Sequence, residues 1–156
     1  MQNKLTGFIL FASIVLSAGF TGCKKDNTPA APTTIDLMVK APWKLSKVLS
    51  GGTDVTNFVT ACTKDNLLRF NVATPANTGS VDEGATKCNA ADAQISNFTW
   101  ELDPAFNRVT ITGNAVILPG SANTFTLVRV NDTEMVISQN VVFFGVTQTA
   151  EATLVH

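Results

Sequence analysis

The stretch NFTWEL, residues 97–102, alternates apolar and polar side chains over most of its length. A period of two places Phe98, Trp100 and Leu102 on one face of a β-strand and the polar residues on the other. An Asp-Pro pair at 103–104 follows directly and is typical of a turn. These residues predict a half-buried strand whose bulky face packs into a core.

The same alternation recurs along the chain, and turn signals separate one stretch from the next. The further predicted strands are residues 43–49, 66–72, 79–87, 108–112, 123–130, 134–140 and 145–155, with 116–118 as a candidate extension of 108–112. Residues 35–39 fit one helical turn, and Asp54 suits the N-cap of a short helix that runs toward Cys62. About eight short strands predict an all-β fold. An antiparallel up-and-down barrel closes them most simply, because closure removes the sheet edges; a β-sandwich is the alternative.

Strand parity also selects the side chains that we expect inside the barrel. The candidate interior residues are Trp43, Leu45, Phe70, Phe98, Trp100, Phe125, Leu127 and Arg129. In a small barrel such side chains fill the interior, but they also suit the apolar wall of a ligand pocket, and the sequence leaves both roles open. Arg129 is expected at the interior or its mouth, where it either stacks on Trp43 or caps an end that faces water. Leu49 is expected on the face of Trp43.

The composition argues against several classes of function. The chain has 156 residues, no tyrosine and one histidine, His156, at its last position. A catalytic triad would have to be built on that terminal residue, and the carboxylate pairs Asp82-Glu83 and Glu101-Asp103 are typical of solvated surface groups, so we expect no enzyme. The formal charge is −1 and no basic block is present, which argues against a nucleic-acid partner.

The first residues have the pattern of an export signal. An apolar run at 8–16 follows Lys4, and a small residue, Gly22, precedes Cys23. The run is shorter than the about 20 residues that a membrane-spanning helix needs. The ending resembles a bacterial lipoprotein signal, which implies cleavage after residue 22 and acylation of the Cys23 thiol. Several acyl chains on that residue would anchor the mature protein stably to a membrane. An ordinary secretory signal with a chance cysteine and a retained transmembrane helix are the alternatives.

The chain therefore divides into a cleaved signal peptide at 1–22, a lipidated polar tether at 23–35 and a single domain at 36–156. The tether is rich in proline and threonine, which favours an extended segment. Its first residues, 24–27, resemble the short charged tag that sends some lipoproteins of Bacteroidota to the cell surface. They equally suit the solvated start of a linker.

Two cysteines remain once Cys23 is assigned to lipid. In an exported chain Cys62 and Cys88 predict one disulfide, and closing a loop of about 27 residues would stabilise the fold by about 3 kcal/mol in the chain-entropy model. Two buried free thiols are the alternative. There is no Cys-x-x-Cys motif and the histidine is terminal, so we expect no metal site and no cofactor.

The spacing of these residues resembles a known family. Residues 41–45, with Trp43, stand where lipocalins carry Gly-x-Trp on their first strand, although Ala41 replaces the glycine. The sequence CTKDN at 62–66, followed by Phe70, Cys88 and Trp100, is similar to the lipocalin-like domain of Bacteroidota lipoproteins. The resemblance covers about residues 35–156, a chain shorter than most lipocalins and without a clear carboxy-terminal helix. It implies an eight-stranded barrel and small apolar ligands.

Two functional hypotheses follow from these patterns. The leading one is a lipocalin-like barrel, anchored to the outer membrane through Cys23, that binds a small hydrophobic molecule. The alternative is a non-enzymatic structural or interaction module with a filled barrel, whose partner is another protein of the cell envelope. Either would work at the periplasmic face or at the cell surface.

Overall fold

The computed structural model describes residues 30–105, 107–113, 118, 123–143 and 145–156. Residues 31–156 form one compact unit, and Cys23 and the predicted signal peptide lie outside the described part. The described elements are α1 (Thr34–Met38), β1 (Trp43–Ser50), β2 (Thr53–Asp54), the 3₁₀ helix η1 (Thr56–Phe58), α2 (Ala61–Lys64), β3 (Leu67–Asn71), β4 (Asn77–Asp82), β5 (Ile95–Asp103), β6 (Arg108–Gly113), β7 (Thr124–Val130), β8 (Glu134–Phe143) and β9 (Val146–Val155). None of the helices in these residues is long and apolar enough to cross a membrane.

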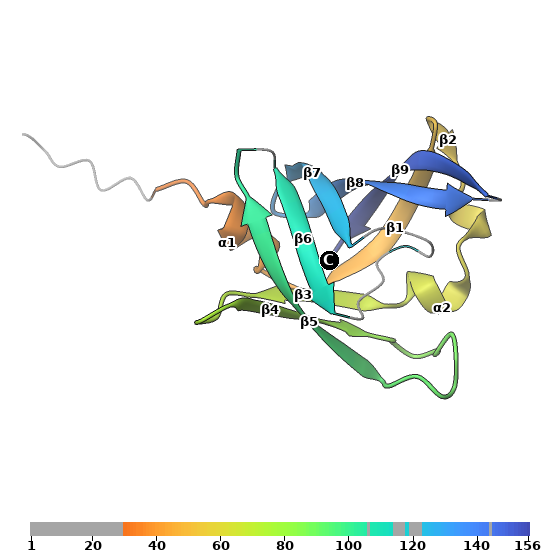
Figure 1. The fold of residues 1–156 in the computed structure, drawn as a ribbon, viewed down its shortest axis with the longest axis horizontal. Helices are drawn as coiled ribbons and strands as arrows, with labels where there is room; N and C mark the ends of the chain where they lie inside the picture. Colours follow the sequence, from red (N-terminus) through yellow and green to blue (C-terminus); the bar gives the residue numbers. More distant parts are fainter. Residues whose placement is uncertain (1–29, 106, 114–117, 119–122, 144) are drawn as a thin grey trace, which may run out of the picture. The chain divides into compact units, whose positions relative to one another are not determined.

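The strands form a closed antiparallel barrel, as the alternation predicts (Figure 1). Within the described residues, the sheet order is β2-β1-β3-β4-β5-β6-β7-β8-β9, and a further pairing of β1 with β9 closes eight of these strands on themselves. In that closing pair Leu45 lies opposite Leu154 and Val48 opposite Ala152. The ninth strand, β2, adds a short hairpin to the end of β1. Successive strands pair in sequence order, which is the up-and-down arrangement.

Large side chains fill the middle of the barrel. Seven of the eight candidate interior residues are buried: Trp43, Leu45, Phe70, Phe98, Trp100, Phe125 and Leu127. Phe70 is the centre of an aromatic cluster, with ring centroids 5.7 Å from Phe98, 5.4 Å from Trp100 and 6.5 Å from Phe125, each in an edge-on geometry. Such tilted contacts are the favoured arrangement of aromatic rings. The core residues predicted from strand parity are thus packed against one another.

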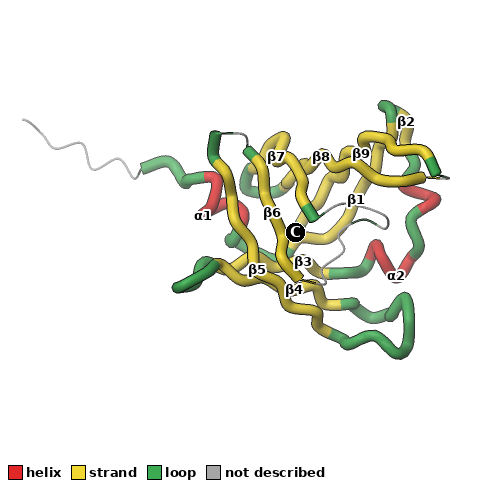
Figure 2. Tube along the Cα trace, in the orientation of Figure 1, coloured by secondary structure: helices red, strands yellow, loops and turns green. Residues whose placement is uncertain are grey.

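The helical turns lie at opposite ends of the barrel (Figure 2). We call the end that carries α1 the α1 end. The opposite end carries β2, η1 and α2, and we call it the cavity end. At the α1 end Met38 is fully buried, and its carbonyl accepts a hydrogen bond of 2.8 Å from the Trp43 indole. The centroids of the Trp43 and His156 rings lie 4.0 Å apart. Lys40, just after α1, forms an ion pair of 2.6 Å with Asp132. These contacts fasten α1 across the end of the barrel.

Two β-bulges, one in β7 and one in β1, reverse the inward and outward positions that alternation predicts for the residues beyond them. In β7 the register shifts between Leu127 and Arg129, because Val128 is inserted without a partner on β8. A bulge places the residues beyond it on the other face of the strand. Arg129 is therefore outside the barrel, with a side chain 57% exposed and an ion pair of 2.8 Å to Glu134, so its expected interior position is wrong.

The bulge in β1 has the same effect. The register against β9 shifts between Leu45 and Lys47, and Val48 rather than Leu49 joins the buried core. The strand predicted at 79–87 is also displaced: β4 ends at Asp82, and the residues after it form a loop. Of the candidate extension at 116–118, the residues 116 and 117 lie outside the described part.

Candidate functional site

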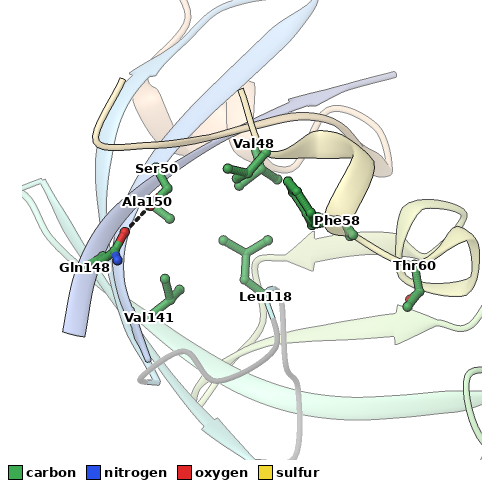
Figure 3. A pocket seen from close by; sticks show the side chains of 10 residues that line it. Val48, Ser50, Phe58, Thr60, Leu118, Val141, Gln148 and Ala150 are labelled. Atoms are coloured by element: carbon green, nitrogen blue, oxygen red, sulfur yellow. Dashed lines mark hydrogen bonds between the residues drawn. The ribbon is translucent and has the colours of Figure 1, made fainter. Parts of the chain in front are cut away.

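The cavity end encloses a cavity of about 410 Å³ (Figure 3). Its walls come from β1, the η1 segment, the residue Leu118, β8 and β9. Most of the lining is apolar, and the described residues that line the cavity are Val48, Ser50, Val55, Phe58, Val59, Thr60, Leu118, Val141, Gln148 and Ala150. Within the described residues no charged side chain lines the cavity. This uncharged, mostly apolar lining suits an apolar ligand rather than an ion.

The cavity exists because the inward side chains of β9 shrink toward this end. Leu154 lies level with Leu45 and Met135, where the barrel is full. Ala152 and then Ala150 follow on the same face, and a methyl group fills far less of the interior than the leucine does. The inward face of β9 therefore tapers from leucine near α1 to alanine at the cavity end.

None of the candidate interior residues lines this cavity. The residues that the sequence suggested for a pocket wall belong instead to the packed core. Arg129 is the exception and lies outside the barrel. The signal that would have found the cavity is the pair of in-phase alanines, Ala150 and Ala152, on the last strand. Two successive inward alanines on one strand leave interior volume that larger side chains would fill.

A polar pair marks one side of the cavity. The Ser50 hydroxyl donates a hydrogen bond of 2.7 Å to the side-chain carbonyl oxygen of Gln148, which joins β1 to β9 (Figure 3). Ser50 is half-buried and Gln148 is exposed, so the pair lies where the cavity meets solvent. Because the bond engages the amide oxygen, the NH₂ group of Gln148 is the donor that a ligand at the mouth would meet. Thr60 adds a second hydroxyl to the lining.

The residues around η1 form an outer wall of the cavity, and two hydrogen bonds hold this wall to Val48 of β1. The backbone N–H of Val48 donates to the Thr56 hydroxyl at 2.9 Å, and the Val48 carbonyl accepts from the Val55 N–H at 2.9 Å. Asp54 accepts a hydrogen bond from the Thr56 N–H at 2.9 Å, and hydrogen bonding by the Thr56 side chain and its backbone N–H holds the pKa of the Asp54 carboxyl below its usual value. Asp54 contacts the start of this turn, but it ends β2, and the N-cap of η1 is Val55 rather than the expected Asp54.

The predicted disulfide is present and lies beside the same wall. Cys62 in α2 is bonded to Cys88 in the loop between β4 and β5, with Cα atoms 5.1 Å apart. The hydroxyl oxygen of Thr60, a cavity-lining residue that also caps α2, lies 3.0 Å from the Cys62 sulfur and 3.8 Å from the Cys88 sulfur. The disulfide is therefore in direct contact with the cavity wall.

Carboxylates of the β4–β5 loop serve its backbone. Asp65 accepts hydrogen bonds from the N–H groups of Ala85 at 3.1 Å and Thr86 at 3.0 Å, which ties the loop to α2. Glu83 accepts from the Cys88 N–H at 3.1 Å. Asp82 accepts from the Gln94 amide at 2.7 Å. These bonds give the Cys-x-x-Asp pattern a structural role, since Cys62 and Asp65 both hold the same loop.

Two large apolar side chains are exposed near the mouth. Phe58 is 76% exposed and Val146 57%. Phe58 belongs to the cavity lining, while Val146 lies on β9, two residues before the lining residue Gln148. A cluster of this kind on a folded surface indicates a contact site for an apolar partner or a route for an apolar ligand.

The described residues contain no group of three or more histidine, cysteine, aspartate and glutamate side chains placed to hold a metal ion. The chain matches no protein-family model and no curated protein sequence.

Proposed function

We propose that the domain binds a small apolar molecule in the cavity of about 410 Å³ at the cavity end. This cavity is the observation that carries the proposal. Its volume lies within the about 300–1,000 Å³ of typical ligand sites, and its apolar walls with a few polar groups match their usual lining. Burying apolar ligand surface contributes about 25 cal/mol per Å². The strands that build the walls are fixed by their ladders, so little ordering is needed on binding.

The proposed setting is the cell envelope, with the domain anchored to the outer membrane through lipid on Cys23. The apolar run that ends at Gly22 and the charged, proline-rich segment after Cys23 support this part of the proposal. The Cys62–Cys88 disulfide is consistent with it, because such bonds persist in oxidising compartments outside the cytosol. A lipocalin-like binding module is compatible with the barrel.

An interaction module is the second candidate. The aromatic core around Phe70 fills the middle of the barrel, so the cavity occupies only one end. The exposed side chains Phe58 and Val146 would then belong to a docking surface for another envelope protein. The two candidates differ in what covers the mouth: a small molecule that enters the cavity or a protein that lies across it.

Native mass spectrometry of the purified protein tests the leading proposal. We expect a retained adduct of small-molecule mass that is released by organic solvent. Loss of the adduct in a variant with a filled cavity would assign it to this site. A protein that carries no adduct and takes up no added apolar ligand would contradict the proposal and leave the interaction module.

A separate experiment tests the anchor. We expect Cys23→Ser to abolish metabolic labelling by a fatty-acid analogue and to release the protein from membranes. Unchanged labelling would show that the acylated residue is another one.

A further inference from the structure

We infer that the cavity selects amphipathic molecules with an uncharged polar head, such as fatty alcohols or esters, over those with a carboxylate. This inference rests on the proposed function, because it names the class of ligand for the same cavity. Its basis is the charge of the lining and the placement of the Ser50–Gln148 pair.

The lining offers no cation to a carboxylate. Within the described residues, all ten lining side chains are uncharged. Moving an ionised carboxylate out of water costs several kcal/mol unless a cation or several donors compensate it. A neutral hydroxyl or ester loses much less hydration in the same position.

Lys47 and Glu151 are charged residues of the lining strands, and neither of them lines the cavity. Lys47 lies on β1 and its ammonium nitrogen is 4.0 Å from the Asp54 carboxylate, with both side chains about half exposed. Glu151 lies on β9 between the inward Ala150 and Ala152, so it faces outward, and it is exposed. The single histidine, His156, packs on Trp43 at the other end of the barrel.

The polar pair fits the head of a neutral ligand. The hydrogen bond between Ser50 and Gln148 orients the Gln148 amide at the mouth, so that its NH₂ group can donate to a hydroxyl or ester oxygen. Val141, Leu118 and Ala150 then receive the apolar chain. The ligand would bind with its chain inward and its head at the level of Gln148.

A competition experiment on two ligands of equal chain length tests this inference. The full chain carrying Cys23→Ser is loaded with a neutral fluorescent naphthylamine, which is displaced by dodecanol or by dodecanoate. At about pH 8, where a carboxyl group is ionised, we expect dodecanol to bind at least about tenfold more tightly. At about pH 4 the dodecanoate should gain affinity and approach dodecanol, since much of it is then protonated.

Two lysine variants locate the effect. Gln148→Lys places a cation at the mouth and should raise the affinity for dodecanoate at about pH 8 by about tenfold or more. Thr149→Lys adds the same charge one residue away, at an exposed position on the outer face, and should leave the preference unchanged. Equal or tighter binding of dodecanoate by the parent protein at about pH 8 would overturn the inference and leave the proposed function intact. A protein that binds neither the naphthylamine nor either competitor would overturn the proposed function and the inference with it.

Discussion

The rings of Trp100 and Phe70 meet edge to face inside the barrel, with centroids 5.4 Å apart and planes at 84°. Trp100 is 1% exposed, and its indole N–H donates a hydrogen bond of 2.9 Å to the carbonyl of Thr78. Neither ring lines the cavity. The filled part of the barrel, which carries stability, is therefore distinct from the cavity end, which we propose to carry binding.

Replacing Trp100 by alanine tests this division. We expect Trp100→Ala to lower the free energy of unfolding by about 3–5 kcal/mol, because it removes a buried ring. That is a large share of the stability of a small domain. Urea unfolding measures the loss, and under conditions where the variant is folded it should still bind the naphthylamine.

Phe58→Ala is the matched control, since this aromatic residue is exposed and lines the cavity. We expect the opposite pattern: a change in unfolding free energy within about 0.5 kcal/mol and weaker probe binding. A Trp100→Ala protein of parent-like stability would mean that the wrong face of β5 has been assigned to the interior.

The disulfide variant tests how the cavity wall is held. Cys62→Ala with Cys88→Ala should cost about 2–4 kcal/mol of stability, as expected for a closed loop of this size. Because Thr60 lies against the disulfide, the amides of Val55 and Phe58 should also exchange with solvent faster than the general loss of stability explains. Hydrogen exchange read by mass spectrometry, with the amides of β5 and β6 as reference, measures both effects. Parent-like local protection of the wall would contradict its dependence on the disulfide.

A close approach between β4 and β5 gives a third prediction. Gly79 pairs with Phe98, and a Cβ atom at Gly79 would overlap the Phe98 ring that lies across it. Gly79→Ala should therefore destabilise the domain by about 1–3 kcal/mol, because the ring has to leave its packed position. Ser80→Ala, at the next residue, should change the urea midpoint little. Equal effects of the two substitutions would show that the ring does not depend on the glycine.

Acid should weaken the α1 end. Hydrogen bonds from the backbone N–H and the hydroxyl of Thr33 lower the pKa of Asp36, and the hydrogen bond and charge of Lys40 lower the pKa of Asp132, both from the usual 3.8. Folding thus favours the ionised carboxylates. Their contribution to stability is present above the usual pKa and is lost as the pH falls through that value and below it.

The pH dependence can be measured by substitution. Asp36→Asn with Asp132→Asn should lower the urea midpoint at about pH 7 and should differ less from the parent at about pH 2. Glu101→Gln with Glu151→Gln, two exposed residues of β5 and β9, makes the same change of charge and serves as control. If both pairs show the same pH dependence, net charge rather than these two contacts explains it.

Alternation along the sequence predicted the closed barrel because most of the strands carry apolar side chains at a period of two. It failed at Arg129 and Leu49, where a bulge in β7 and another in β1 reverse the parity. A single inserted residue leaves the local pattern apolar and polar as before, so only the pairing of two strands reveals it. Parity within one strand therefore identified the core but not all of its members.

The candidate site was less accessible to sequence reasoning. The disulfide was predicted by counting thiols in a chain that we expect to be exported, whereas the cavity depends on which small side chains meet across strands. Ser50, Ala150 and Gln148 come together only through the closing pair β1–β9, whose partners are about 100 residues apart. The sequence analysis selected bulky residues as candidates for the pocket wall, whereas the cavity forms beside small side chains such as Ala150.

The most direct test of the central claim is to fill the cavity with a tryptophan at position 141 and to compare this variant with the same substitution at position 142. Val141 is buried and lines the cavity, whereas Val142 is 56% exposed on the opposite face of β8. Fluorescence titration with the neutral naphthylamine should show one saturable site in the parent protein and in Val142→Trp, and no site in a folded Val141→Trp. Equal binding by the two variants, or no binding by the parent, would contradict the claim that this cavity is the ligand site.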